Sequence, residues 1–291
     1  MFIQCIFFLS LFINKVFSDD YMPVNRIVNA LPAELNQFPY QVSISLAGVW
    51  GVPFIISQNP ICSGSIIHPR WILTSAYCVY ELTSKDRILV QAGKNFINEA
   101  TEPYQQNRFV NKVYLHPSYP GENARHDIAL LTLDKPLSIN QNVMAVNLPA
   151  PEVVYLGEGI VAGWGSTSFS QNTELSTELR YDTVPIIEHD KCNEILKDKR
   201  LPLQVFSEQI CTGSGIRNSA VCNGDSGGPL VTKEKLDGYH VQIGIISWGL
   251  FPCGKDEIGA VYTRVSCYID WIDDIVLSDK DNIKNTEFEQ Q

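Results

Sequence analysis

The sequence lacks an excess of basic residues, and after its first residues it lacks any long hydrophobic run. Of 291 residues, 22 are Lys or Arg and 32 are Asp or Glu, so the formal net charge is −10. Nucleic-acid binders need a basic face for phosphate contacts. A membrane-spanning helix needs about 20 consecutive apolar residues. We therefore expect neither a nucleic-acid partner nor a membrane partner.

Closely spaced cysteine pairs and Asn-x-Ser/Thr sequons are also missing. Zinc sites in proteins commonly use Cys-x-x-Cys pairs, and none of the eight cysteines is spaced in this way. The sequence therefore predicts no metal site and no cofactor. The absence of sequons predicts that the chain carries no N-linked glycan.

The N-terminus resembles a leader that is removed. Residues 2–13 are almost purely apolar, and Val16 and Ser18 fit a signal-peptidase site before Asp19. We expect residues 1–18 to be a signal peptide and the protein to be secreted. Secretion favours disulfides, and the loss of Cys5 leaves an odd set of seven, namely Cys62, Cys78, Cys192, Cys211, Cys222, Cys253 and Cys267.

Short alternating runs dominate the rest of the chain and predict an all-β fold, a sandwich or a barrel. The strongest strand candidates are residues 40–46, 87–92, 109–114, 128–133, 159–164 and 241–248. Only the end is typical of a helix, with Tyr268, Ile272 and Ile275 on one face. From Ser278 the chain becomes polar, so we expect residues 278–291 to form a flexible tail.

A glycine-rich segment around Ser226 carries the candidate chemistry. It runs Cys222-Asn223-Gly224-Asp225-Ser226-Gly227-Gly228-Pro229-Leu230. A serine nucleophile needs a tight turn and backbone N–H groups directed at the developing oxyanion. The glycines permit such a turn, although turn chemistry alone also allows a hairpin with an incidental serine.

As a string, these nine residues resemble the nucleophile loop of the chymotrypsin family of serine proteases. The resemblance continues through residues 71–78, 126–131, 163–165, 247–249 and 262–265. It implies two packed six-stranded antiparallel β-barrels over residues 27–277 with a C-terminal helix, after a propeptide of residues 19–26. It also implies three disulfides and an unpaired Cys267; the implied pairs are Cys62–Cys78, Cys192–Cys211 and Cys222–Cys253.

The same resemblance assigns roles to individual residues. Ser226 becomes the nucleophile, Asp127 the orienting acid, and the N–H groups of Gly224 and Ser226 the oxyanion donors. Cleavage between Arg26 and Ile27 would free an amine that pairs with Asp225. An uncleaved chain is the alternative.

Position 77 departs from the family pattern. The family has its catalytic histidine immediately before the second cysteine of this loop, and here that residue is Tyr77. A phenol titrates near 10, so it is a poor general base at pH 7. It also lacks a second nitrogen with which to bridge an aspartate and a serine. A histidine elsewhere in the chain could replace the missing base. His126 adjoins Asp127, but neighbours on an extended strand point to opposite faces, so we do not expect it to reach the site.

The specificity pocket can be compared in the same way. Ala220 stands where trypsin-like members have an aspartate, followed by Val221, while Gly249 and Ala260 fall at the entrance and the back wall. The resemblance thus implies a small apolar pocket. Lys94 occupies a calcium-ligand position, so we expect no calcium. An apolar insertion over residues 47–61 is either a contact surface or a loop folded back on the first barrel.

Two functions follow from this comparison. The first is a secreted, catalytically inactive serine protease homologue, a monomer that binds extracellular proteins as a decoy, cofactor or competitor. Host defence proteins are one such partner class, since residues 147–150, 177–180 and 268–272 are similar to mite trypsin-like enzymes, which include inactivated paralogues. The alternative is an active endopeptidase with weak or unconventional catalysis.

Overall fold

The structure of the protein is a computed structural model. It describes residues 30–49, 60–83, 86–98, 101–121, 125–166, 175–216, 221–222, 224–234, 238–250, 253 and 256–288. The expected signal peptide, propeptide and Arg26–Ile27 junction lie outside the described residues. So do Ala220 and residues 50–59 of the apolar insertion.

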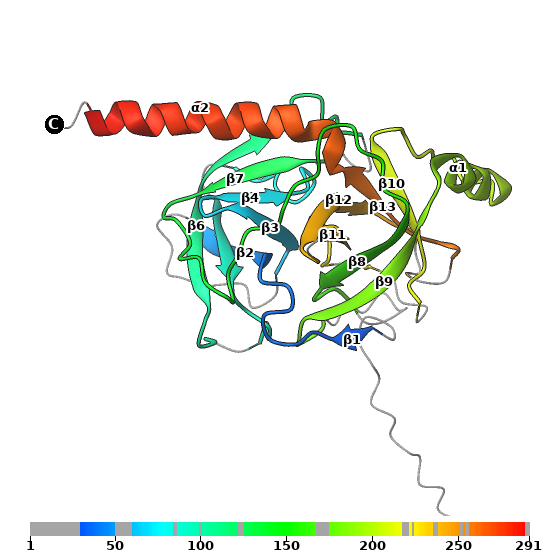
Figure 1. Cartoon of the computed structure of the whole chain (residues 1–291), viewed down its shortest axis with the longest axis horizontal. Coiled ribbons are helices and arrows are strands. Elements are labelled where there is room, and N and C mark those ends of the chain that lie inside the picture. Colours follow the sequence, from blue (N-terminus) through cyan, green and yellow to red (C-terminus); the bar gives the residue numbers. More distant parts are fainter. Residues whose placement is uncertain are drawn as a thin grey trace, which may run out of the picture.

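The first half of the chain forms a closed antiparallel barrel (Figure 1). Around the barrel, the strands are β2 (Gln41–Val49), β3 (Cys62–His68), β4 (Trp71–Thr74), β7 (Ala129–Leu133), β6 (Gln106–Leu115) and β5 (Asp86–Ala92). Because strand side chains alternate between faces, β7 serves two cores. Leu131 and Leu133 fill the barrel, while Leu130 points to a second cluster outside it.

The second half forms another six-stranded barrel. Its strands are, in order, β9 (Arg180–Ile187), β10 (Gln209–Gly213), β13 (Ile258–Arg264), β12 (His240–Trp248), β11 (Pro229–Lys233) and β8 (Gly157–Gly163). Pairing of β8 with β9 closes the ring, and β1 (Leu31–Pro32) adds to the outside of β9. The all-β expectation of two six-stranded barrels with a C-terminal helix is confirmed.

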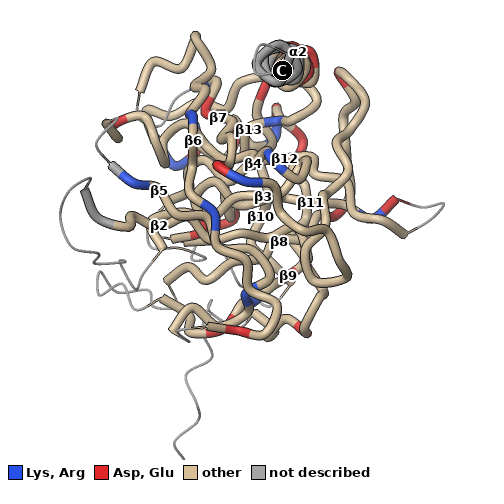
Figure 2. The backbone as a smooth tube through the Cα atoms, turned by 90° about the vertical axis from the view of Figure 1, so that its left-hand side faces the viewer, with Lys and Arg blue, Asp and Glu red and all other residues tan. Residues whose placement is uncertain are grey.

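A shared hydrophobic cluster joins the two barrels to the C-terminal helix. After a 3-10 turn, η1 (Val265–Tyr268), the chain enters α2 (Ile269–Phe288). Leu73 and Leu130 from the first barrel and Ile245 from the second meet Ile269 and Ile272 of α2. Figure 1 shows α2 lying across the first barrel, and the end-on view in Figure 2 places it beside β7 and β13. The helix therefore packs over the junction of the two barrels.

Two helical segments differ from the expectations. Helix α1 (His189–Asp198) was not among the expected elements. Its buried residues are Cys192, Ile195 and Leu196, an i, i+3, i+4 spacing typical of a helix. The backbone of residues 278–288 continues α2, where the polar composition predicted a flexible tail. The stretch contains neither glycine nor proline, and extending an existing helix costs much less than nucleating one.

Three disulfides join the cysteines as the resemblance implied. They are Cys62–Cys78, Cys192–Cys211 and Cys222–Cys253, and Cys267 is a free, half-buried thiol. Cys62–Cys78 ties β3 to the loop after β4. Within the described residues, no helix has the length and apolar character needed to cross a bilayer.

The docking of α2 can be tested with two substitutions on this helix. Ile272 is 1% exposed in the shared cluster, whereas Leu277 is 56% exposed one and a half turns later. We expect Ile272→Ala to lower the free energy of unfolding by about 2–4 kcal/mol. Leu277→Ala should change it by less than about 0.5 kcal/mol. Urea denaturation of both variants measures the difference; equal losses would show that α2 does not dock through Ile272.

Candidate active site

The Ser226 loop is held between the two barrels by backbone hydrogen bonds. The N–H of Ser63, on β3 of the first barrel, donates to the Ser226 carbonyl at 2.8 Å. The Gly227 N–H donates to the Ile246 carbonyl, on β12 of the second barrel, also at 2.8 Å. The serine is thereby fixed at the seam where the barrels meet.

Two glycines in this loop adopt backbone angles that other residues disfavour. Gly224 has φ 98° and Gly227 has φ 79°, both in the left-handed region. Gly227 is also crowded, because a Cβ there would overlap Thr74 Oγ1 and Ser63 O. The positive φ angles and the crowding at Gly227 both require glycine. The crowding favours the expected nucleophile turn over a simple hairpin, because it arises where the second barrel approaches the first.

Asp225, the residue before Ser226, is 1% exposed. Its carboxylate accepts hydrogen bonds from the Gly165 N–H at 2.7 Å and from the Cys222 N–H at 2.9 Å. Burial raises the pKa of Asp225 to about 6, and the two backbone bonds only partly oppose that rise. No cation among the described residues pairs with it, and Ile27, the expected partner, lies outside them.

Asp127 lies two residues before β7, and both oxygens of its carboxylate accept hydrogen bonds. Oδ1 accepts from the Tyr77 backbone N–H at 2.8 Å and Oδ2 from the Ser247 hydroxyl at 2.6 Å. Burial raises the pKa of Asp127 above its ordinary value, against the opposing effect of these hydrogen bonds. The Thr263 hydroxyl holds the Asp127 carbonyl at 2.7 Å.

Tyr77 contacts Asp127 through its backbone N–H rather than its ring. The adjacent Cys78 Sγ lies 3.5 Å from the Ser226 carbonyl oxygen, so the loops of Tyr77, Asp127 and Ser226 converge. The Tyr77 ring is 48% exposed and lies 6.3 Å from the Tyr80 ring. Within the described part of the chain, its hydroxyl makes no hydrogen bond to Ser226 or Asp127.

The histidine rings make their hydrogen bonds elsewhere. His126 Nδ1 bonds the Tyr268 hydroxyl at 3.0 Å, and its ring stacks on His116 at 5.0 Å. His126 is turned away from Asp127 because its φ is 60°, not because of strand alternation, since β7 begins only at Ala129. The His240 ring is hydrogen-bonded to the Tyr40 hydroxyl, and the His68 ring accepts from the Arg70 N–H. His189, the first residue of α1, is hydrogen-bonded to the Val205 carbonyl.

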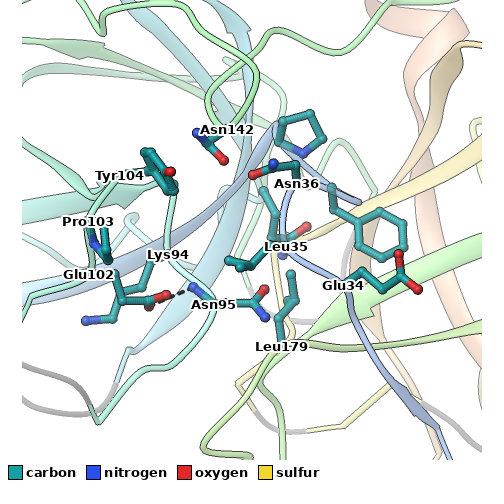
Figure 3. A pocket seen from close by; sticks show the side chains of 14 residues that line it. Glu34, Leu35, Asn36, Lys94, Asn95, Glu102, Pro103, Tyr104, Asn142 and Leu179 are labelled. Carbon is teal, nitrogen blue, oxygen red and sulfur yellow. Dashed lines mark hydrogen bonds between the residues drawn. The ribbon is translucent and has the colours of Figure 1, made fainter.

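Three of the four expected pocket residues come together in the second barrel. Val221 packs on the cluster that contains fully buried Ala260, and a Cβ added to Gly249 would lie at van der Waals distance from Ala260. In the first barrel, Lys94, which stands at the expected calcium-ligand position, is buried. The Oε1 of Glu102 accepts hydrogen bonds from the N–H groups of Asn95 (Figure 3) and Phe96, each at 2.7 Å. No metal-binding cluster of acidic, histidine or cysteine residues occurs among the residues described.

Some contributors to the site were missed by residue-level reasoning. Ser247 and Thr263 hold Asp127, and Gly165 holds Asp225, yet all three entered the sequence analysis only as parts of family strings. No spacing rule connects Ser247 with Asp127 across 120 residues. Only the pairing of the strands brings them together.

Two closed β-barrels with a glycine-bounded serine and a buried aspartate at their seam define the chymotrypsin-like serine protease fold. The trypsin family model matches residues 27–272. Coagulation factor IX of Cavia porcellus is 36% identical over 262 residues, 87% of this chain and 82% of the relative. Coagulation factor IX of Oryctolagus cuniculus is 35% identical over 260 residues, 87% of this chain and 85% of the relative. The chain belongs to the trypsin family.

The burial of Asp225 predicts a distinctive pH dependence in the uncleaved chain. Its pKa of about 6 in the folded state lies above the ordinary value of 3.8. Well below the ordinary pKa of 3.8 the carboxyl is protonated in both states, and its burial lowers stability by no ionisation cost. As pH rises through 6, the folded state must ionise a buried group that the unfolded state ionises freely, so stability falls.

We expect unmutated protein to lose roughly 2–3 kcal/mol relative to Asp225→Asn between pH 4 and pH 7. Urea denaturation of both proteins at each pH measures this difference and cancels the titration of other groups. A difference that stays constant with pH would contradict the prediction. Chain cleaved after Arg26 serves as the comparison, because a free Ile27 amine should reduce the loss.

Proposed function

We propose that this trypsin-family chain is a secreted serine protease homologue that works by binding extracellular proteins rather than by cleaving them. The proposal rests on the hydrogen bonds made by the Asp127 carboxylate. Its carboxylate is held by Ser247 and the Tyr77 backbone, and among the residues that the structure describes no imidazole hydrogen-bonds it to Ser226. On this proposal Tyr77 occupies the place of the general base.

The chemistry of the remaining groups supports this reading. Acyl transfer by serine requires a base within hydrogen-bond reach of the hydroxyl. The phenol of Tyr77 lies against Tyr80 and is half exposed. Within the described part of the chain, the rings of His126, His189 and His240 bond residues other than Ser226. Without a base, the Ser226 hydroxyl keeps its proton and attacks a peptide carbonyl very slowly.

The binding features of the site are retained. None of the hydrogen bonds within the described residues uses the N–H of Gly224 or of Ser226, so both can donate to a carbonyl oxygen of a bound peptide. Ala260 and Val221 leave no charge for a cationic side chain. A partner that inserts a small apolar residue fits such a cleft, which suits a decoy, cofactor or competitor, with host defence proteins among the candidates.

The alternative is an active endopeptidase with weak catalysis and a preference for small apolar residues. The retention of Ser226, Asp127 and the two N–H groups favours it. The loss of the imidazole weighs against it, because these groups bind and orient but do not remove the proton. The two proposals therefore differ in whether Ser226 is reactive.

Reactivity of Ser226 can be measured directly with a fluorophosphonate probe. Using protein cleaved after Arg26, we expect labelling no faster than that of the Ser226→Ala control, because an unassisted hydroxyl is a poor nucleophile. Intact-mass spectrometry over time gives the rate. Fast labelling that depends on Ser226 would overturn the non-catalytic proposal and support the endopeptidase.

Restoring the base should restore part of the activity. We expect Tyr77→His, cleaved after Arg26, to hydrolyse peptides, since imidazole titrates near the working pH and can bridge Asp127 and Ser226. Recovery should be partial, because His and Tyr differ in volume. Peptides with Ala or Val before the scissile bond should react faster than those with Arg or Lys, whose charge would be buried unpaired.

Two controls accompany this revertant. Tyr77→Phe keeps the ring but supplies no base and should stay inactive, and Tyr77→His combined with Ser226→Ala should lose all recovered activity. A revertant that remains inactive with a free Ile27 amine would show that more than the base is lost. Preferred cleavage after Arg would contradict the pocket assignment.

A further inference from the structure

Two histidine rings stack on each other where the first barrel meets the C-terminal helix. His116 follows β6 and His126 precedes β7, and their ring centroids lie 5.0 Å apart with an angle of 12° between the ring planes. Tyr268 of η1 meets both rings at nearly a right angle. Trp271 of α2 lies 5.2 Å from His116, measured between ring centroids. We refer to these four residues as the histidine stack, which joins the β6–β7 connection to the start of α2.

The hydrogen bond made by the His116 ring requires that ring to be neutral. The backbone N–H of Ser118 donates to His116 Nδ1 at 3.2 Å, so this nitrogen is an acceptor and the ring proton of the neutral form lies on Nε2. A protonated imidazole carries a hydrogen on each nitrogen and accepts no hydrogen bond. Protonation of His116 therefore breaks the bond from Ser118 and leaves two N–H groups opposed.

His126 differs from His116, because it can be protonated without losing its hydrogen bond. Its Nδ1 lies 3.0 Å from the Tyr268 hydroxyl, and a hydroxyl can donate to a neutral ring or accept from a charged one. A positive charge on His126 disfavours a second charge on the ring stacked against it. Burial, followed by the charge of His126, lowers the pKa of His116 below its ordinary value.

The other titratable groups on the adjoining segments do not pair with the two histidines. These groups are Arg125, Glu208, Arg264, Cys267, Asp270 and Asp274. Arg125 and Glu208 pair with each other, and Arg264 donates to the Cys267 thiol, whose pKa is raised by burial. The two aspartates of α2 are exposed, so water and salt screen their charges. Within the described residues, no ion pair joins either histidine of the stack to a carboxylate.

The histidine stack is connected both to α2 and to the segment that carries Asp127. His126 directly precedes Asp127 and has a φ of 60°, a backbone conformation that a non-glycine residue keeps only where its surroundings fix it. The bond to Tyr268 and the stack on His116 are such surroundings. Tyr268 is 4% exposed and belongs to the same hydrophobic cluster as Ile272 of α2. A change in the stack therefore acts on the helix and on the Asp127 segment together.

We propose that the histidine stack is an acid-sensitive latch between the first barrel and α2. In its neutral form it fixes the start of α2 and the His126 backbone beside Asp127. In acid, protonation of His116 breaks the bond from Ser118 and places two cations in one stack, so the start of α2 and the Asp127 segment loosen. The latch does not depend on whether Ser226 is reactive.

The sign of the pH dependence follows from the unfolded chain, which binds the His116 proton more readily than the folded chain does. The stabilisation by the neutral stack is therefore fully present above the ordinary histidine pKa of about 6.5 and is lost as pH falls below it. Burial of Asp225 acts in the opposite direction, because it lowers stability as pH rises. A variant of His116 that keeps Asp225 separates the two effects.

The test compares the unmutated mature protein with His116→Asn at pH 7 and pH 5. Asparagine can still accept from the Ser118 N–H through its side-chain oxygen but cannot be protonated. On acidification, the unfolding equilibrium constant in urea should rise at least about threefold more for the unmutated protein than for the variant. His189→Asn, which removes an exposed histidine of α1, should show the pH dependence of the unmutated protein. Equal pH dependence in the unmutated protein and His116→Asn would overturn the proposal.

Two further measurements locate the change, and one of them needs no variant. In NMR spectra of the unmutated protein, the His116 ring should titrate with a midpoint below about 6.5; a midpoint above that value would show that the aromatic rings around it stabilise the imidazolium, and would overturn the latch. Amide hydrogen exchange at pH 5, corrected for the intrinsic effect of pH, should show lost protection at residues 126–131 and 268–276 but not in β11. Protection that is unchanged at these two segments, or lost equally in His116→Asn, would also overturn it.

Discussion

The whole site depends on how closely the two barrels approach at Gly227. This residue has no side chain, and it fits between Ser63 and Thr74 of the first barrel while its N–H bonds Ile246 of the second. Adding a Cβ would push the barrels apart, because the overlapping atoms include a backbone carbonyl and cannot turn aside. Ser226 and the loop of Tyr77 therefore face each other only as long as this contact holds.

Asp127 and Asp225 are both buried carboxyls, but their hydrogen-bond partners differ. Asp127 is held by a hydroxyl and a backbone N–H at the cleft, whereas Asp225 is enclosed by backbone N–H groups alone. Burial raises the pKa of both. Asp225 has no cation beside it among the described residues, and the resemblance implies that an Ile27 amine freed by cleavage after Arg26 would supply one.

Much of the fold was predictable from local signals, and the failures have local explanations. The six strand candidates all fall on strands, because alternation directly reflects the two faces of a sheet. Helix α1 was not predicted, because only three of its ten residues are buried and so its apolar periodicity in the sequence is short. The contacts of Ser247 and Gly165 were not predictable from spacing, because they join segments that meet only after both barrels close.

The position of His126 illustrates how a correct conclusion can have a different physical cause. On an extended strand, His126 would point away from Asp127 and could not replace the base. The structure excludes it through a left-handed backbone, a bond to Tyr268 and a stacked His116. Because this arrangement anchors the residue before Asp127 to η1, moving the imidazole toward Ser226 would require breaking the bond to Tyr268 and the stack on His116. A replacement base at position 126 would therefore forfeit both contacts, whereas the proposed function places the missing imidazole at position 77, whose backbone N–H already bonds Asp127.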